Sequence, residues 1–252
     1  MTFILRNVGF SYSDSDSERK VEVLRGLSTE FAAGERIAIR GPSGVGKSTL
    51  ISILGLLTGT SDFTGSVSFT GTDSNGQQIT FDYRSNSVDT QAELRRTTFG
   101  FALQSGYLMP HLSVVENIAV PLGLNGVPKT ERRERVEEIL ERQPDLRKKC
   151  DSLPGQLSGG QRQRVSVLRA LIHRPMVVFA DEPFSQLDAE NREAILDTLV
   201  EWQAGELPGQ SGDGERTLFL VCHNDQVALE RCTCWYRLGA EFLFVEERPE
   251  TP

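Results

Sequence analysis

The sequence GPSGVGKS at residues 41–48 fits the pattern G-x-x-x-x-G-K-[ST], which predicts a loop that binds phosphate. Glycines permit the tight turns that bring successive backbone N–H groups onto phosphate oxygens. Lys47 supplies positive charge to the β- and γ-phosphates, and the Ser48 hydroxyl supplies an oxygen to Mg²⁺. The alternative is a chance glycine-rich turn. The predicted phosphate-binding residues are Gly41, Pro42, Ser43, Gly44, Val45, Gly46, Lys47, Ser48 and Thr49.

Two adjacent carboxylates, Asp181 and Glu182, follow an apolar run at residues 176–180. That run predicts a strand, and α/β sheets bind their ligands at the carboxyl ends of strands. A parallel strand at residues 36–40 would bring both acids close to Ser48. Asp181 then suits the Mg²⁺ shell, and Glu182 suits a general base that polarises an attacking water. The alternative is a pair of acids that merely ends the strand.

The rest of the chain predicts the elements that hold these groups. Short apolar strands alternate with helices, which indicates an α/β fold with a mostly parallel sheet. Residues 60–90 are rich in Ser, Thr, Gly, Asn and Asp and predict a small antiparallel β region. The helical middle, about residues 105–165, interrupts the alternation as a subdomain. Expected strands also lie at residues 2–10, 21–31, 97–103 and 217–222, and expected helices at residues 48–57, 129–142, 158–173 and 189–203.

Local side-chain patterns support two of the helices. Ser113 and Glu116 have the spacing of a capping box at a helix start. Pairs of opposite charge four residues apart support a solvated helix at residues 129–142 rather than a functional charge patch. These pairs are Glu131–Arg135, Arg133–Glu137 and Glu138–Arg142.

Composition and charge exclude some classes of protein. The 252 residues include 27 Lys and Arg against 35 Asp and Glu, and the formal net charge is −8. Because duplex binding needs a basic face, no nucleic-acid partner is expected. The richest apolar stretch, residues 50–57, is far shorter than the about 18 residues that a membrane-spanning helix needs. The N-terminus lacks a signal-peptide pattern, so a secreted protein is not expected either.

Three of the four cysteines, Cys222, Cys232 and Cys234, lie near His223. A metal site is conceivable there, but the spacing is not that of paired C-x-x-C ligands. Strand alternation would also place Cys222 and His223 on opposite faces. Reduced thiols are the interpretation that we favour.

The segment LSGGQRQRVSVLRAL at residues 157–171 resembles the signature motif of the ATP-binding-cassette (ABC) family. The resemblance covers nearly the whole chain and implies one cassette over residues 1–252, a P-loop NTPase with an inserted helical subdomain. In the family, this motif completes the nucleotide site of a facing subunit, so that two subunits enclose two ATP. The resemblance implies that role for Ser158, Gly159, Gly160 and Gln161.

Further family elements follow in the expected order. Gln104 is similar to the glutamine that reaches Mg²⁺ and the attacking water. Asp188 ends SQLD at residues 185–188, which resembles the loop that crosses the dimer interface. His223 resembles the histidine that holds the γ-phosphate, and Tyr12 the aromatic residue that stacks on adenine, with an ordinary strand aromatic as the alternative.

The sequence departs from the family pattern without losing a catalytic group. Phe184 stands where Thr is usual, and the His223 region reads VCHN where VTHD is common. Because Glu182 and the signature motif are intact, the resemblance implies an ATP hydrolase that uses Glu182, His223, Gln104 and Lys47.

The apolar segment at residues 107–124 suggests what the ATPase drives. In the family this zone receives a helix of a membrane permease, and Tyr107, Leu108 and Met109 are candidate contacts; packing within the subdomain is the alternative. The stretch resembles the lipoprotein-release, macrolide-export and cell-division branch. We therefore expect a dimer on the cytoplasmic face of a membrane. The alternatives are a cassette ATPase in nucleic-acid or ribosome work and a non-transporting regulator of a membrane-bound enzyme.

Overall fold

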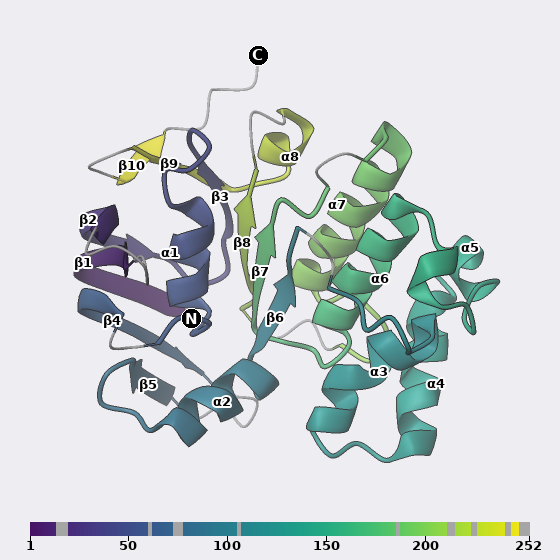
Figure 1. Ribbon diagram of the computed structural model, residues 1–252. Helices are drawn as coiled ribbons and strands as arrows, with labels where there is room; N and C mark the ends of the chain where they lie inside the picture. The colour runs from purple at the N-terminus through teal and green to yellow at the C-terminus, as the bar shows by residue number, and fades with distance from the viewer. Residues whose placement is uncertain are drawn as a thin grey trace. The chain divides into compact units, whose positions relative to one another are not determined.

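The computed structural model describes residues 1–13, 20–59, 62–72, 78–104, 107–184, 187–210, 215–222, 226–239 and 243–246 (Figure 1). The chain forms two compact units. Unit 1 comprises Met1–Arg95 and Phe219–Pro252, and unit 2 comprises Arg96–Leu218. Each unit is described by itself.

Unit 1 contains an antiparallel sheet in the order β2-β1-β4-β5. Its side chains alternate, so that Phe3 and Leu5 of β1 are buried while Arg6 is exposed. The register of β1 shifts beyond Arg6, where Asn7 has a φ of +53°. The strands are β1 (Thr2–Ser13), β2 (Lys20–Phe31), β4 (Phe63–Thr72) and β5 (Gln78–Asp82).

Unit 1 also contains strands of the predicted parallel sheet. β3 (Arg36–Arg40) runs parallel to β9 (Cys234–Leu238), and β10 (Leu243–Glu246) pairs with β9 in the antiparallel sense. Rings of the two sheets meet in an aromatic core, where Phe219 lies 5.3 Å from Phe3 and 5.2 Å from Phe31 between ring centroids. The helices are α1 (Lys47–Leu54), most of α2 (Val88–Thr97) and α8 (Gln226–Glu230).

Unit 2 is built on β6 (Phe99–Ala102) and β7 (Val177–Asp181), which are parallel neighbours. β8 (Thr217–Val221) begins in unit 2 and ends in unit 1. The helix α3 packs against α6 and α4, and α6 packs against β6 and α7 (Figure 1). The helices are α3 (Val114–Leu124), α4 (Lys129–Leu140), α5 (Pro144–Arg147), the 3₁₀ turn η1 (Pro154–Gln156), α6 (Gly159–Leu171) and α7 (Ala189–Ala204).

The mixed α/β fold with a parallel and a small antiparallel sheet confirms the predicted fold class. The capping box at Ser113 is confirmed, because its Oγ accepts from the Glu116 N–H at 3.3 Å and its N–H donates to Glu116 at 2.8 Å. Two of the predicted pairs form along α4, Arg133–Glu137 and Arg135–Glu131. Arg142 lies beyond the end of α4 and pairs with Glu201 of α7 instead.

Candidate functional site

The phosphate loop, residues 41–48, leaves β3 and enters α1 through glycines that no other residue could replace without strain. Gly41, Gly44 and Gly46 have φ angles of +146°, +77° and +104°. A Cβ on Gly41 would lie 2.4 Å from the carbonyl oxygen of Leu238, and a Cβ on Gly46 would lie 2.8 Å from Cγ1 of Val23. The backbone turn therefore depends on these glycines.

Lys47 is only 6% exposed although it carries a charge. Its Nζ donates to the carbonyl oxygens of Gly41 and Pro42, each at 2.9 Å, so the ammonium is fixed over the loop. Gly46 caps α1 without a side-chain hydrogen bond, which leaves the N–H groups of the first turn available. A cation beside a helix N-terminus is a strong anion site.

Tyr12 lies near this loop within unit 1. The residue is 54% exposed, and its ring packs edge-on against Phe10 with 4.8 Å between centroids. The Tyr12 hydroxyl lies 3.3 Å from Oγ1 of Thr49 in α1. The aromatic face is thus held beside the phosphate loop, and stacking on adenine stays a prediction.

The predicted carboxylates lie at the end of β7, which closes with Asp181. Ala102 of β6 is in register with Ala180, so residues two positions further on come together. Nε2 of Gln104 donates to Oε2 of Glu182 at 3.2 Å. Glu182 has a φ of +47°, a left-handed conformation that costs about 1–3 kcal/mol in a non-glycine residue and is common at functional sites.

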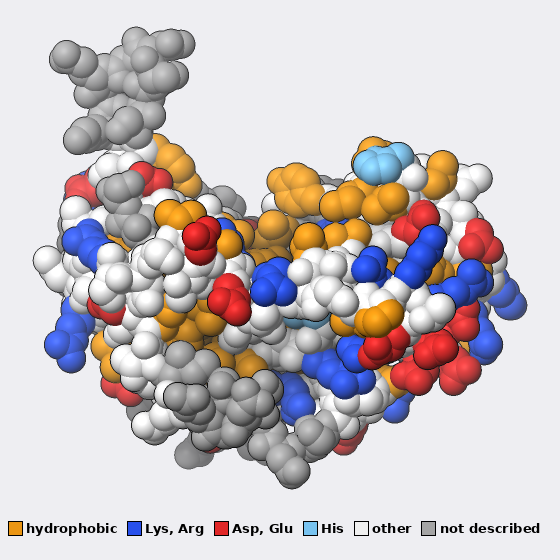
Figure 2. Space-filling model, turned by 90° about the horizontal axis from the view of Figure 1, so that it is seen from below, with side chains coloured by type: hydrophobic (Ala, Val, Ile, Leu, Met, Phe, Trp, Pro, Cys, Tyr) orange, Lys and Arg blue, Asp and Glu red, His pale blue; other side chains and the backbone are white. Residues whose placement is uncertain are grey.

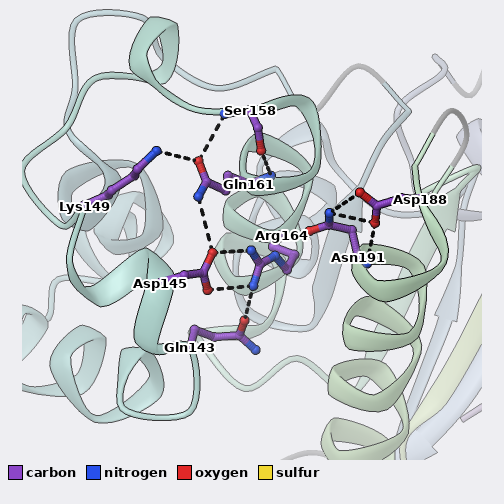
Figure 3. A network of polar contacts seen from close by, with 8 residues as sticks. All are labelled: Gln143, Asp145, Lys149, Ser158, Gln161, Arg164, Asp188 and Asn191. Atoms are coloured by element: carbon purple, nitrogen blue, oxygen red, sulfur yellow. Dashed lines mark hydrogen bonds and ion pairs between the residues drawn. The ribbon is translucent and has the colours of Figure 1, made fainter.

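The signature turn, Ser158–Gln161, lies at the N-terminus of α6 in unit 2. The Ser158 Oγ accepts from the Gln161 N–H at 3.2 Å, and the Ser158 N–H donates to Oε1 of Gln161 at 3.1 Å. A Cβ on Gly160 would lie 2.5 Å from Cγ of Asn191, whose N–H donates to Oδ1 of the α7 cap Asp188 at 2.8 Å. Asp188 therefore fixes the residue against which the signature turn packs (Figure 3).

Charged residues around Gln161 were not predicted from the sequence. Nζ of Lys149 donates to Oε1 of Gln161 at 2.9 Å, and Nε2 of Gln161 donates to Asp145 at 3.3 Å. Arg164 forms a two-pronged ion pair with Asp145 (Figure 3). The S-x-x-Q spacing of Ser158 and Gln161 signals the capping box, but nothing in the spacing identifies its charged partners.

The apolar segment beyond Gln104 presents exposed side chains, with Tyr107 at 68% and Met109 at 38%. Figure 2 shows a face on which hydrophobic side chains lie beside a histidine. The buried amide of Asn117 holds this segment, because it donates to the Met109 carbonyl at 3.1 Å and accepts from the Met109 N–H at 2.7 Å. Arg169 donates to the Tyr107 carbonyl at 2.9 Å.

Some predicted residues lie outside the described part of the chain, namely His223 and residues 185–186 of the SQLD motif. The four cysteines are free thiols, and Cys222 and Cys232 are buried. In the part of the chain that the structure describes, no group of three His, Cys, Asp or Glu side chains is placed to hold a metal ion. Among the described residues, no helix combines the length and hydropathy that crossing a bilayer requires.

Comparisons with known proteins agree with this geometry. Residues 24–185 match the family described as ABC transporter. The macrolide export ATP-binding/permease protein MacB of Shigella flexneri is 39% identical over 227 residues, and that of Escherichia coli K12 is 38% identical. Each match covers 90% of this chain but 31% of the relative, so the chain spans about a third of the length of these curated relatives.

Solved structures show the same fold along nearly the whole chain. The ATP-binding cassette MJ0796, in a dimeric post-hydrolysis state with ADP and Pi, is 29% identical. It superimposes with a TM-score of 0.80 over 97% of this chain and 98% of its own. A second dimeric structure of MJ0796 gives a TM-score of 0.78 at 28% identity. The chain belongs to the ABC transporter family, as one of its ATPase cassettes.

Proposed function

We propose that the chain is a nucleotide-binding subunit that dimerises around two ATP, hydrolyses them and drives a separate membrane permease. The observation that carries this proposal is the hydrogen bond between Gln104 and Glu182 at the end of β7. It joins an amide and a carboxylate that can together orient and polarise a water molecule. Relatives named as export ATP-binding/permease proteins support the coupling to transport.

The predicted residues around the nucleotide have distinct roles in this scheme. The phosphate loop and Lys47 bind the β- and γ-phosphates, Tyr12 stacks on adenine, and His223 holds the γ-phosphate. Ser48, Gln104 and Asp181 offer hydroxyl, amide and carboxylate oxygens, the donor types that Mg²⁺ takes. The chemistry that Mg²⁺ supplies when bound is neutralisation of charge on the phosphates. Glu182 receives the proton of the attacking water as general base.

The second proposed partner is another copy of the chain. Unlike the phosphate loop with its buried Lys47, the signature turn has its neighbouring described cations, Lys149 and Arg164, engaged with Gln161 and Asp145. It therefore suits half of an anion site, completed by a facing subunit. The dimeric structures of MJ0796 support this arrangement.

The proposed permease contact is the segment Tyr107–Leu124, whose exposed Tyr107 and Met109 stand on a loop held by Asn117. Since the relatives carry their permease part in a longer chain, the proposal places this cassette on the cytoplasmic face of a membrane. Affinity purification from membranes with mass spectrometry should recover an integral membrane protein. Loss of that protein from Tyr107→Ala samples would support the contact, whereas recovery of ribosomes or DNA would reject it.

The direct test of hydrolysis is Glu182→Gln, which keeps the hydrogen bond to Gln104 possible but removes the base. ATP turnover should fall by about a thousandfold, in the range that general bases and positioning supply. With ATP and Mg²⁺ the variant should accumulate as a dimer in analytical ultracentrifugation. Glu190→Gln, at the start of α7, is the matched control and should turn over normally. A monomeric Glu182→Gln protein with normal turnover would reject the scheme.

A further inference from the structure

The side chain of Gln161 forms its hydrogen bonds within its own unit (Figure 3). Its Oε1 accepts from the Ser158 N–H at 3.1 Å and from Nζ of Lys149 at 2.9 Å, and its Nε2 donates to Oδ2 of Asp145 at 3.3 Å. A glutamine amide offers two acceptor and two donor positions, so three of the four are occupied. Gln161 therefore braces the signature turn from inside rather than reaching outward.

Asp145 is the anchor of this arrangement. Arg164, three residues beyond Gln161 on α6, donates to Oδ1 of Asp145 at 2.9 Å and also pairs with its Oδ2. The Arg164 side chain is only 13% exposed and makes a third contact, to Oε1 of Gln143 at 3.0 Å. A two-pronged pair at a partly buried arginine fixes orientation as well as distance.

The charge of Asp145 is secured by the same contacts. Partial burial acts to raise the pKa of Asp145, but the hydrogen bonds and positive charge of Arg164 outweigh it and lower that pKa. Arg164 thus pairs with a carboxylate that stays ionised at neutral pH. The Gln161 amide lies between Lys149 and Asp145, so its orientation is set by a cation at its oxygen and an anion at its nitrogen.

We propose that Asp145 is a positioning residue for the ATP bound by the partner subunit. Asp145 orients the Gln161 amide, and Oε1 of Gln161 accepts a hydrogen bond from the Ser158 N–H. The other N–H groups in the first turn of α6 are then left to bind the γ-phosphate. This inference rests on the proposed function, because it assumes that the signature turn acts across a dimer. A rotated Gln161 would release the Ser158 N–H, and the first turn would no longer be ordered before the subunits meet. Asp145 itself touches no nucleotide in this scheme.

The test uses the full chain with Glu182→Gln, in which the ATP-bound dimer accumulates. Adding Asp145→Asn should weaken ATP-driven dimerisation by about tenfold, as expected for the loss of a charge-assisted contact, while ATP affinity of the monomer changes less than twofold. Glu201→Gln is the matched control, because it breaks the Arg142–Glu201 pair in the same unit without reaching Gln161. If Asp145→Asn behaves like Glu201→Gln, the proposal is wrong.

A double-mutant cycle separates positioning from a general loss of stability. In a Gln161→Met background, Asp145→Asn should have no further effect on dimerisation. An undiminished effect there would show that Asp145 acts by another route and would overturn the inference. If Asp145→Asn does not fold, Arg164→Lys takes its place, since it keeps the charge but loses the two-pronged geometry. If Glu182→Gln itself does not dimerise with ATP, the proposed function fails first.

Mixed dimers test the direction of the effect. Each nucleotide site in the proposed dimer combines the phosphate loop of one subunit with the signature turn of the other. A heterodimer of a Lys47→Ala subunit and an Asp145→Asn subunit has one site in which both parts are intact. A heterodimer of the Lys47→Ala/Asp145→Asn double variant and the otherwise unchanged subunit has no such site. The first mixture should therefore form heterodimers more tightly, and equal affinity of the two mixtures would contradict an action across the interface.

Discussion

The phosphate loop and the signature turn both contain glycines and both lead into a helix, but their polar groups have different hydrogen-bond partners. In the phosphate loop, Gly46 caps α1 without a side-chain bond and Lys47 is buried over the loop carbonyls. In the signature turn, Ser158 and Gln161 cap each other, and the nearby charges are engaged with Gln161 and Asp145. We therefore expect the first loop to hold a polyphosphate alone and the second to offer only part of a site.

The largest expected difference between the two loops is in nucleotide binding by the monomer. Lys47→Ala removes the buried cation and should weaken ATP binding by about 100-fold or more, the scale of a lost charged hydrogen bond. Titration of a fluorescent ATP analogue measures it. Lys148→Ala, an exposed lysine in unit 2, is the matched control and should leave binding unchanged. Equal binding by both variants would mean that the phosphate loop is not the primary site.

Alanine at one glycine in each loop should have opposite effects on stability. Gly46→Ala forces a side chain into a φ of +104° and against Val23, which should lower the free energy of unfolding by about 1–3 kcal/mol. Gly159→Ala meets no heavy atom nearer than 4.0 Å and gains helix propensity, so it should stabilise by up to about 1 kcal/mol. Urea unfolding compares the two, and a destabilised Gly159→Ala protein would contradict the open geometry of that position.

Removal of the side-chain cap tests the rigidity of the signature turn. Ser158→Ala leaves the Gln161 N–H without its acceptor and should lower the free energy of unfolding by about 1 kcal/mol. Ser158→Thr keeps an oxygen at the same position and serves as the control. Thermal unfolding measures the stability, and amide hydrogen exchange at the start of α6 measures the local order of the turn. No loss of protection in Ser158→Ala would show that the cap does not order the turn.

The last prediction concerns the other end of α6 and the dependence of stability on pH. Beyond the C-terminus of α6, His173 is partly buried with Nε2 2.9 Å from the Phe99 carbonyl oxygen, and loss of solvation lowers its pKa below the usual range. The unfolded chain binds this proton near pH 6.5, and the folded protein does so only at lower pH. The free energy of unfolding should therefore fall as pH drops below about 6.5, by no more than about 1.4 kcal/mol per pH unit.

His173→Gln removes that titration and should flatten the pH dependence measured by urea unfolding. A variant with the same slope as the unchanged chain would assign the pH dependence to other groups.

Much of the site follows from local sequence, because backbone turns and helix caps depend on residues a few positions apart. The glycines and Lys47 of the phosphate loop, the acids that end β7 and the capping residues Ser113 and Glu116 belong to this class. Their identities select the conformation through φ preferences and short-range hydrogen bonds. The family resemblance added roles for Gln104, Ser158 and Asp188 that spacing by itself does not assign.

Tertiary structure decided the contacts between residues distant in sequence. The register of β6 with β7 brings Gln104 to Glu182, 78 residues away, and imposes no recognisable pattern on either segment. Hydrogen bonds to Asp145 of α5 and to Lys149 beyond its end likewise connect this segment to Gln161 of α6. From sequence alone, a charged residue on a helix is predicted to be exposed to solvent. Only folding shows which charge has a buried partner, because pairing depends on helix position and orientation rather than on residue type.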